Sequence, residues 1–138
     1  MLVLAACLAV GRGGVAQADG GCLTREQAIT LIAHKTDVER PGIVNKWRIW
    51  AIADRESGLT MCVNGWVKVS PTGDVGLLQM HRVGGVWSNC LVNRWCRRPD
   101  LISDPEYQID VMLNYAERYG DLCPWNPNGD YLPGCGYR

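Results

Sequence analysis

One apolar stretch limits the possible folds more than any other part of the chain. The residues from Gly42 or Ile43 to Ser57 are apolar on nearly every side of a helix, and Gly58 follows them directly. A helix that is apolar on most sides is buried in a core, and glycine commonly follows the last residue of a helix. The sequence therefore predicts a central buried helix with Glu56 in its last turn.

Two further helices are predicted from the residues at their ends. The first runs from Thr24 to Thr36 and begins with the T-x-x-Q spacing of a capping box. The other runs from Pro105 to Tyr119, with Asp104 as its N-cap and Gly120 directly after it. Together with the central helix, they predict a mainly helical domain.

The segment between the central and last helices adds a small β component. Leu59–Thr72 is expected to be irregular or to form a short β-hairpin, since Asn64-Gly65 is the strongest hairpin turn signal in the chain. Gly76–Met80 is expected to begin a short helix, and Gly84–Pro99 is expected to be rich in loops. The predicted fold class is α+β, mainly helical, in one domain over residues 19–138.

The first 18 residues have the pattern of an export signal. Leu2–Val10 is an apolar run too short to span a bilayer, and Ala16-Gln17-Ala18 is a small-x-small cleavage site before Asp19. Leu4–Cys7 is similar to a bacterial lipobox, which would make Cys7 a lipidated N-terminus. We expect a secreted or extracytoplasmic protein without a stable membrane span, or alternatively one anchored by lipid through Cys7.

The cysteines left after removal of this signal predict disulfide bonds, since an even number in a small exported domain is typical of them. The sequence does not choose among the possible pairings, although Cys90–Cys96 and Cys123–Cys135 would close short loops. No C-x2-C spacing occurs, so no zinc site is expected. The six cysteines are Cys22, Cys62, Cys90, Cys96, Cys123 and Cys135.

Charge and motifs exclude several classes of function. The chain has 14 basic and 14 acidic residues, and this balance gives no basic excess for nucleic acid. It contains no phosphate loop, dinucleotide fingerprint or nucleophile elbow, and we expect no cofactor and no metal. Six Trp and five Tyr but no Phe suit core, interface and sugar-stacking positions alike.

Two carboxylates are candidates for catalysis. At the end of a buried helix, the helix dipole and burial both raise the pKa of a carboxyl group such as Glu56, as a general acid requires. The alternative is an ordinary exposed glutamate. Asp74 lies in a glycine-bounded turn, where it either bonds its own backbone or acts as the second carboxylate of a glycosidase.

Three polar residues offer weaker indications. Gln79 has donors and acceptors that suit a sugar amide or hydroxyl, or it fixes its turn as a core-facing amide. Cys62 and His81 have the chemistry of a thiol nucleophile and its base, but a disulfide at Cys62 is favoured in an exported chain.

Two motifs, Glu56-Ser57-Gly58 and Gly73–Met80, follow a helix rich in Trp, Ile and Ala. In their residues and in their separation along the chain, they resemble the lysozyme-like superfamily, and most closely the bacterial lytic transglycosylases and small secreted lysozyme-like proteins. A third similarity is the helix from Asp104-Pro105 through Gln108 to Arg118-Tyr119-Gly120. The resemblance covers about Trp47 to Trp125.

The resemblance implies a lysozyme-like fold with a glycan-binding groove. By resemblance, Glu56 is the acid that protonates the β-1,4 bridging oxygen between N-acetylmuramic acid and N-acetylglucosamine. In a transglycosylase it then helps the muramyl C6 hydroxyl close a 1,6-anhydro ring, whereas water attacks in a hydrolase. The sugar's acetamido group can replace a second carboxylate. Ser57 and Gln79 match positions that support the acid or touch sugar, and Tyr119 is a further substrate-binding candidate.

Some residues depart from the transglycosylase pattern. His81–Gly85 stands where many members have a proline-containing continuation, the later tyrosine motif with N-A-G is absent, and the cysteine content is high. These departures favour a small secreted lysozyme-like protein, expected to be a monomer that acts on peptidoglycan glycan strands. The alternatives are a catalytically inactive lysozyme-like module that binds glycan or protein, and a disulfide-stapled inhibitor or toxin.

Overall fold

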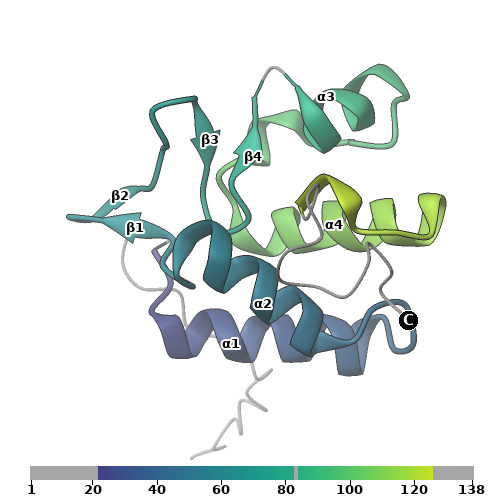
Figure 1. The fold of residues 1–138 in the computed structure, drawn as a ribbon, viewed down its shortest axis with the longest axis horizontal. Coiled ribbons are helices and arrows are strands. Elements are labelled where there is room, and N and C mark those ends of the chain that lie inside the picture. Colours follow the sequence, from purple (N-terminus) through teal and green to yellow (C-terminus); the bar gives the residue numbers. More distant parts are fainter. Residues whose placement is uncertain (1–21, 83, 126–138) are drawn as a thin grey trace, which may run out of the picture.

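A computed structural model of the chain describes residues 22–82 and 84–125. The described part is α+β and mainly helical, with two small antiparallel hairpins (Figure 1). Its α-helices are α1 (Arg25–His34), α2 (Lys46–Ser57), α3 (Gly85–Val92) and α4 (Pro105–Tyr119). Its strands are β1 (Cys62–Val63), β2 (Trp66–Val67), β3 (Asp74–Val75) and β4 (Met80–His81). Short turns of other helix types are η1 (Lys35–Glu39, π), η2 (Pro99–Leu101, 3-10) and η3 (Cys123–Trp125, 3-10).

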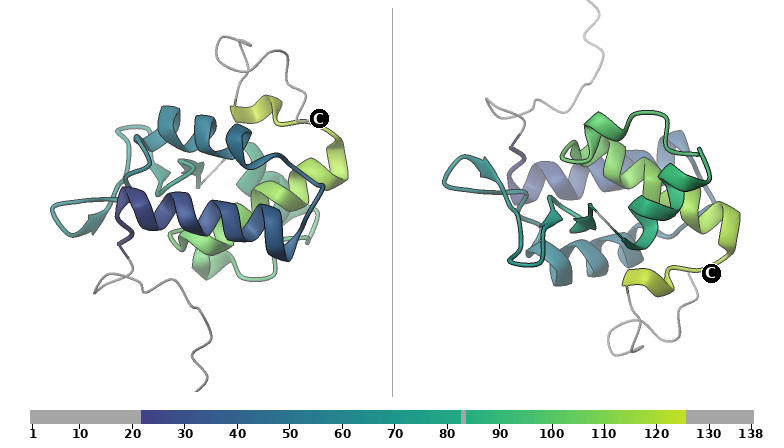
Figure 2. Two further views of the ribbon diagram at one scale, coloured as in Figure 1. Left: turned by 90° about the horizontal axis from the view of Figure 1, so that it is seen from below. Right: turned by 90° about the horizontal axis from the view of Figure 1, so that it is seen from above.

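The helices pack around one apolar core, and the hairpins lie at one end of it. Helix α1 packs against both α2 and α4, and α3 packs against α4 and β4. Figures 1 and 2 show α1 and α2 side by side, with the β1–β2 hairpin beyond the C-terminal end of α2, and in Figure 1 the β3–β4 hairpin lies above that end. The last turn of α2 therefore faces the β region.

The predicted helix ends are confirmed where a local cap defines them. Thr24 and Gln27 form the capping box before α1, and Asp104 Oδ1 accepts a hydrogen bond from the Tyr107 N–H at 2.7 Å. Helix α4 has the predicted bounds and ends before Gly120, which has a φ of 78°. Capping depends on residues three apart, so sequence alone can predict it.

Helix α2 differs from its prediction in its start and in its burial. It begins at Lys46, because the Asn45 side chain accepts from the Trp47 N–H and caps it there. Ile49 and Ile52 are fully buried, but Trp47 is 64% exposed. The prediction of burial on nearly all sides is therefore wrong, because Trp47 near the start of the helix and Asp54 and Arg55 near its end are exposed.

Two predictions about the segment after the first hairpin are wrong. Residues 76–79 form the turn between β3 and β4 and do not begin a helix. Gly76 and Gln79 both have positive φ, 78° and 47°, which a right-handed helix does not allow. The stretch Gly84–Pro99 contains α3, whose Val86, Trp87 and Cys90 are buried. By contrast, the hairpin at Asn64-Gly65 is confirmed.

A buried lysine fastens the end of α1 to α4. Lys35 is 3% exposed and forms ion pairs with Glu39 at 2.8 Å, Glu106 at 2.9 Å and Asp110 at 3.2 Å. Burial opposes its charge, but hydrogen bonds to these carboxylates outweigh burial and raise the pKa of Lys35. Removing one partner of such a group typically costs about 3–5 kcal/mol. Nothing in the local sequence marked this lysine as buried.

Disulfide bonds tie loops to the helical core. Cys22–Cys62 joins the chain before α1 to β1, and the predicted pair Cys90–Cys96 is confirmed at the end of α3. Disulfide bonds are compatible with an oxidising, extracytoplasmic environment. Cys123 is also disulfide-bonded, but its predicted partner Cys135 lies outside the described residues, as do the export signal and Cys7.

No helix in the described ranges has the length and apolar character needed to cross a membrane.

Candidate active site

Glu56 lies in the last turn of α2, where the hairpins meet the helices (Figure 1). Its side chain is half-buried. Burial raises the pKa of Glu56, the charge of Arg55 opposes this shift, and the charge of Asp74 adds to it. Two carboxylates that are 18 positions apart in sequence therefore interact electrostatically.

The end of α2 holds Glu56 in place through backbone hydrogen bonds. Gly58 is left-handed at φ 68°, and the N–H of Leu59 donates to the Ala53 carbonyl at 3.1 Å. Ser57 is buried and its hydroxyl donates to the same carbonyl at 2.9 Å. Ser57 therefore supports the helix end, and its side chain is turned into the protein.

Asp74 lies on β3 and is held by three side chains. Its carboxylate accepts hydrogen bonds from Ser70 at 2.8 Å and Thr72 at 2.6 Å, and it bonds His81 Nδ1 at 2.6 Å. Burial opposes its charge, but these hydrogen bonds outweigh burial and lower the pKa of Asp74. The pKa of Asp74 is thus shifted in the opposite direction to that of Glu56.

His81 is a member of this site that the sequence interpretation missed. It pairs with Asp74 across the β3–β4 hairpin, and a Cβ at Gly84 would lie 2.8 Å from its Cδ2. The absence of a side chain at Gly84 thus makes room for the imidazole. The weaker interpretation, in which His81 activates Cys62, is wrong because Cys62 is bonded to Cys22.

Gln108 on α4 connects two of the motifs that were recognised separately in the sequence. Its buried side chain accepts a hydrogen bond from the Leu78 N–H at 2.9 Å. Its Nε2 donates to the carbonyls of Val75 at 2.8 Å and Ile102 at 2.5 Å. One amide therefore fixes the β3–β4 turn, and with it Asp74, to the last long helix.

Gln79 occupies the last position of the β3–β4 turn and is partly exposed. Its Nε2 donates to the Gly76 carbonyl at 2.8 Å, which stabilises the turn. This contact corresponds to the alternative in which Gln79 fixes its turn. Its Oε1 has no partner among the described residues and stays available as an acceptor.

Tyr119 belongs to an aromatic cluster near the end of α4. Its hydroxyl donates to Asn89 Oδ1 at 2.9 Å, and its ring lies 4.6 Å from that of Tyr115. Tyr115 contacts Trp125, whose Nε1 donates to the Leu78 carbonyl at 3.2 Å. Tyr119 thus reaches the β3–β4 turn only through other residues, and no contact of the described residues joins it to Glu56.

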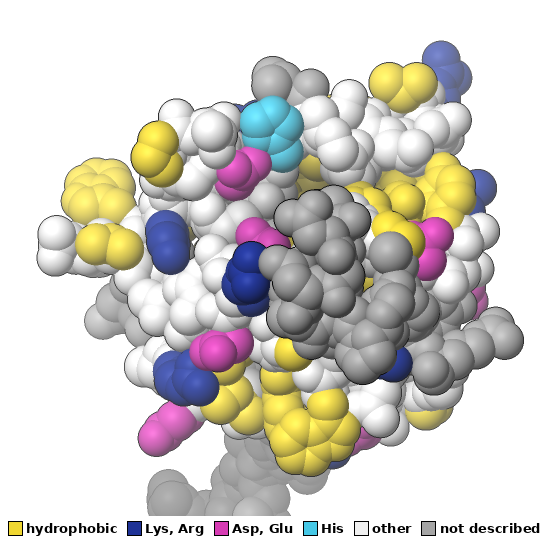
Figure 3. Space-filling model, in the orientation of Figure 1, with side chains coloured by type: hydrophobic (Ala, Val, Ile, Leu, Met, Phe, Trp, Pro, Cys, Tyr) yellow, Lys and Arg dark blue, Asp and Glu magenta, His cyan; other side chains and the backbone are white. Residues whose placement is uncertain are grey.

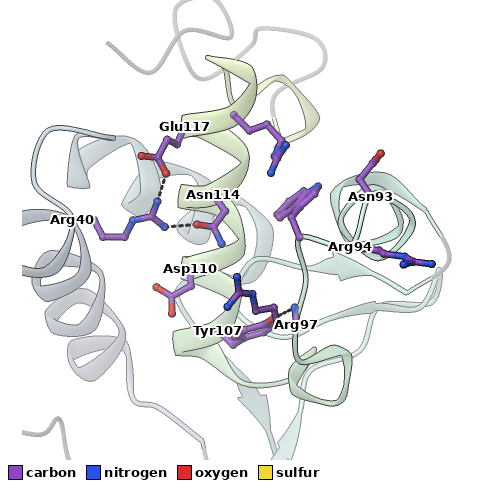
Figure 4. Close-up of a pocket in the computed structure, with 10 residues that line it drawn as sticks. Arg40, Asn93, Arg94, Arg97, Tyr107, Asp110, Asn114 and Glu117 are labelled. Atoms are coloured by element: carbon purple, nitrogen blue, oxygen red, sulfur yellow. Dashed lines mark hydrogen bonds and ion pairs between the residues drawn. The ribbon is translucent and has the colours of Figure 1, made fainter.

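A pocket formed by the described residues lies elsewhere, between Arg40, α4 and the loop after α3 (Figure 4). Its volume is about 740 Å³. A second pocket of about 600 Å³ surrounds residues 41–47, and a third of about 290 Å³ lies beside Trp50. Glu56 lines none of these three, so a glycan groove beside it stays a prediction.

The β1–β2 hairpin carries apolar side chains into solvent. Trp66 is 80% exposed and Val63 is 53% exposed. Figure 3 shows hydrophobic side chains standing out at the tip of this hairpin, at the left of the view. The described ranges contain no group of three or more His, Cys, Asp or Glu residues placed to hold a metal ion.

The chain was also compared with known proteins. No family model, no curated protein and no solved structure matches it.

Proposed function

We propose that this protein cleaves the β-1,4 bond between N-acetylmuramic acid and N-acetylglucosamine in peptidoglycan, with Glu56 as the general acid. One observation carries the proposal: Glu56 is half-buried in the last turn of α2, at the junction with the hairpins, and Asp74 is held on β3 by three side chains. In these positions burial raises the pKa of Glu56, and hydrogen bonds lower the pKa of Asp74. In glycosidases, the general acid and its charge-stabilising partner are usually two carboxyl groups whose environments shift their pKa values in opposite directions.

The proposed reaction begins with protonation of the bridging oxygen by Glu56. The bond to the muramic acid C1 then breaks and positive charge develops on that sugar. An ionised Asp74, fixed by Ser70, Thr72 and His81, stabilises this charge. The oxygen of water in a hydrolase, or of the muramyl C6 hydroxyl in a transglycosylase, then bonds to C1, and its proton passes to the deprotonated Glu56. Gln79 offers a free amide oxygen to a sugar hydroxyl or N–H.

The test compares wild-type protein, Glu56→Gln and Glu26→Gln on purified peptidoglycan, with the products identified by mass spectrometry. Glu26 is an exposed glutamate on α1, so the same chemical change there serves as a matched control. We expect the wild type and Glu26→Gln to release fragments at equal rates and Glu56→Gln to lose at least about 100-fold in rate. Anhydromuramyl ends identify a transglycosylase, and reducing ends identify a hydrolase.

The same experiment distinguishes the alternative of a catalytically inactive binding module. The exposed face of Trp66 favours that alternative, because an indole can stack on a sugar ring. A module of this kind would sediment with peptidoglycan without releasing fragments, and Trp66→Ala would weaken the association while Glu56→Gln would not. Absence of release by the wild type, or equal release by Glu56→Gln, would contradict the enzymatic proposal.

Export is part of the proposal, since peptidoglycan lies outside the cytoplasm. Cleavage after Ala18 would leave Asp19 as the first residue of the mature protein, whereas lipid attachment would leave Cys7. N-terminal sequencing and mass measurement of the protein made in a bacterial host separate these two results. An uncleaved chain that stays in the cytoplasm would contradict both.

A further inference from the structure

The pocket between Arg40, α4 and the loop after α3 has a polar floor and two basic walls. Its floor is the outer face of α4, and Arg40 forms one wall (Figure 4). The other wall is the loop from Asn93 to Arg97, which follows α3. The α4 side chains on the floor are spaced three or four residues apart and are Tyr107, Asp110, Asn114 and Glu117.

Arginines dominate the charge of this pocket. Four arginines and two carboxylates line it. Glu117 pairs with Arg40 at 2.6 Å, and Asp110 shares Lys35 with Glu39 and Glu106. Arg97 has no hydrogen bond or ion pair from its side chain within the described residues. Arg118 lies over the ring of Trp95 at 6.0 Å. The guanidinium groups of Arg97 and Arg118 therefore form no ion pair with a carboxylate within the described part of the chain.

The neutral groups of the pocket also offer hydrogen-bond donors. The Tyr107 oxygen accepts from the backbone N–H groups of Arg97 at 2.9 Å and Arg98 at 2.8 Å, so its own proton is free to be donated. The Asn114 oxygen accepts from Arg40 at 2.6 Å, which leaves its amide N–H groups without a partner in the described residues. A ligand that matches these groups is anionic and carries additional carbonyl acceptors.

The layout favours a peptide over a bare inorganic anion. Figure 4 shows Arg40 and Arg97 pointing into the pocket from opposite sides, whereas Arg94 points away from it. The donors are spread along α4 instead of converging on one point, and a volume of about 740 Å³ is far larger than one phosphate ion needs. Trp95 adds a partly exposed aromatic face between the basic groups.

We propose that this pocket binds a carboxylate-bearing peptide, with the guanidinium groups of Arg97 and Arg118 holding its carboxylates. Tyr107 and Asn114 donate to its carbonyl oxygens. Planar guanidinium groups pair well with carboxylates. The identity of the natural ligand rests on the proposed function: the short peptides attached to peptidoglycan strands carry such carboxylates. The pocket would then hold a peptide while the Glu56 site acts on the glycan.

The first test needs only the wild-type protein and a synthetic probe. The probe is the pentapeptide L-alanyl-γ-D-glutamyl-L-lysyl-D-alanyl-D-alanine, and its comparison is the same peptide with both carboxylates amidated. Isothermal titration calorimetry is expected to show binding of the free acid and at least about tenfold weaker binding of the amide, a difference of about 1.4 kcal/mol. Inorganic phosphate at the same concentration is expected not to displace the peptide.

The second test places the binding in this pocket. Arg97→Gln and Arg118→Gln are each expected to weaken binding of the free-acid peptide at least about fivefold. The Arg98→Gln variant is expected to bind this peptide as tightly as the wild type does. Arg98 is a suitable control because it is exposed, pairs with Asp100 and does not line the pocket. Circular dichroism spectra of all three variants check that they fold.

The outcomes separate this inference from the proposed function. No binding of the free acid, equal binding of the amide, displacement by phosphate, or equal binding by Arg97→Gln and Arg98→Gln would each overturn the peptide pocket. Glu56→Gln is expected to bind the peptide like the wild type. Peptide binding without fragment release from peptidoglycan would instead contradict the proposed enzymatic activity and support the peptide pocket.

Discussion

Gln108 and Gly76 touch so closely that no side chain fits between them. A Cβ at Gly76 would lie 2.5 Å from Gln108 Nε2. The amide that fills this space holds Leu78, Val75 and Ile102 by hydrogen bonds. The glycine in the turn and the glutamine on α4 are therefore two halves of one contact, which positions the hairpin that carries Asp74.

Gly76→Ala is expected to destabilise the protein by about 3 kcal/mol, because the new Cβ both meets Gln108 and adopts a φ of 78°. Gly73→Ala is the matched control: its φ is 89°, but its Cβ meets nothing within 4 Å. This control is expected to cost about 1 kcal/mol, from the backbone alone. Urea unfolding at neutral pH measures both, and equal losses would contradict the role of the contact.

Truncating Gln108 is expected to cost about 3–5 kcal/mol, since it leaves one buried N–H and two buried carbonyls without a partner. In a Gln108→Ala background the added cost of Gly76→Ala is expected to fall to about 1 kcal/mol, because the clash is gone. Equilibrium unfolding of the two single variants and the double variant gives this coupling. Strictly additive losses would show that the two residues do not act on each other.

Glu56→Gln is expected to stabilise the protein at pH 7 and to leave it unchanged at low pH. The fold raises the pKa of Glu56 above its ordinary value near 4.5, so ionising it costs stability as the pH rises. Gln cannot ionise and escapes this cost. Thermal unfolding from pH 3.5 to 8 is expected to show a gain in Tm that disappears below about pH 4.5. Glu26→Gln is the control, and a gain independent of pH would contradict the assignment.

Asp74→Asn is expected to show the opposite dependence on pH. The fold lowers the pKa of Asp74 below its ordinary value near 3.8, so its charge stabilises the protein at neutral pH, and this contribution is lost as the pH falls through the lowered pKa. The variant is therefore expected to lose Tm at pH 6 and to approach the wild type in strong acid. The same scan on Asp54→Asn, an exposed aspartate of α2, provides the comparison.

The disulfides Cys22–Cys62 and Cys90–Cys96 are expected to contribute unequally to stability. Cys22–Cys62 spans 40 residues and Cys90–Cys96 spans 6. Loop-closure entropy gives about 4 kcal/mol for the first and about 2 kcal/mol for the second. Paired serine substitutions at each bridge, measured by urea unfolding, test the order. A greater loss from the shorter loop would show that native contacts, and not chain entropy, dominate.

The chain's local signals predicted much of its secondary structure. The cap at Asp104, the bounds of α4 and the turn at Asn64-Gly65 follow from residues within a few positions of one another. Local signals failed at residues 76–79, which were expected to begin a helix but form a hairpin turn with positive φ values at Gly76 and Gln79. That turn depends on Gln108, about 30 positions away.

Sequence alone thus identified Glu56 at the end of a buried helix and Asp74 in a glycine-bounded turn. Only the tertiary structure decided that these carboxylates interact, that His81 holds Asp74, and that Gln108 fixes the hairpin beneath them. The physical reason is the range of the interactions. Helix caps and turns are satisfied by neighbouring residues, whereas a buried amide or a shifted pKa depends on what distant segments place around it.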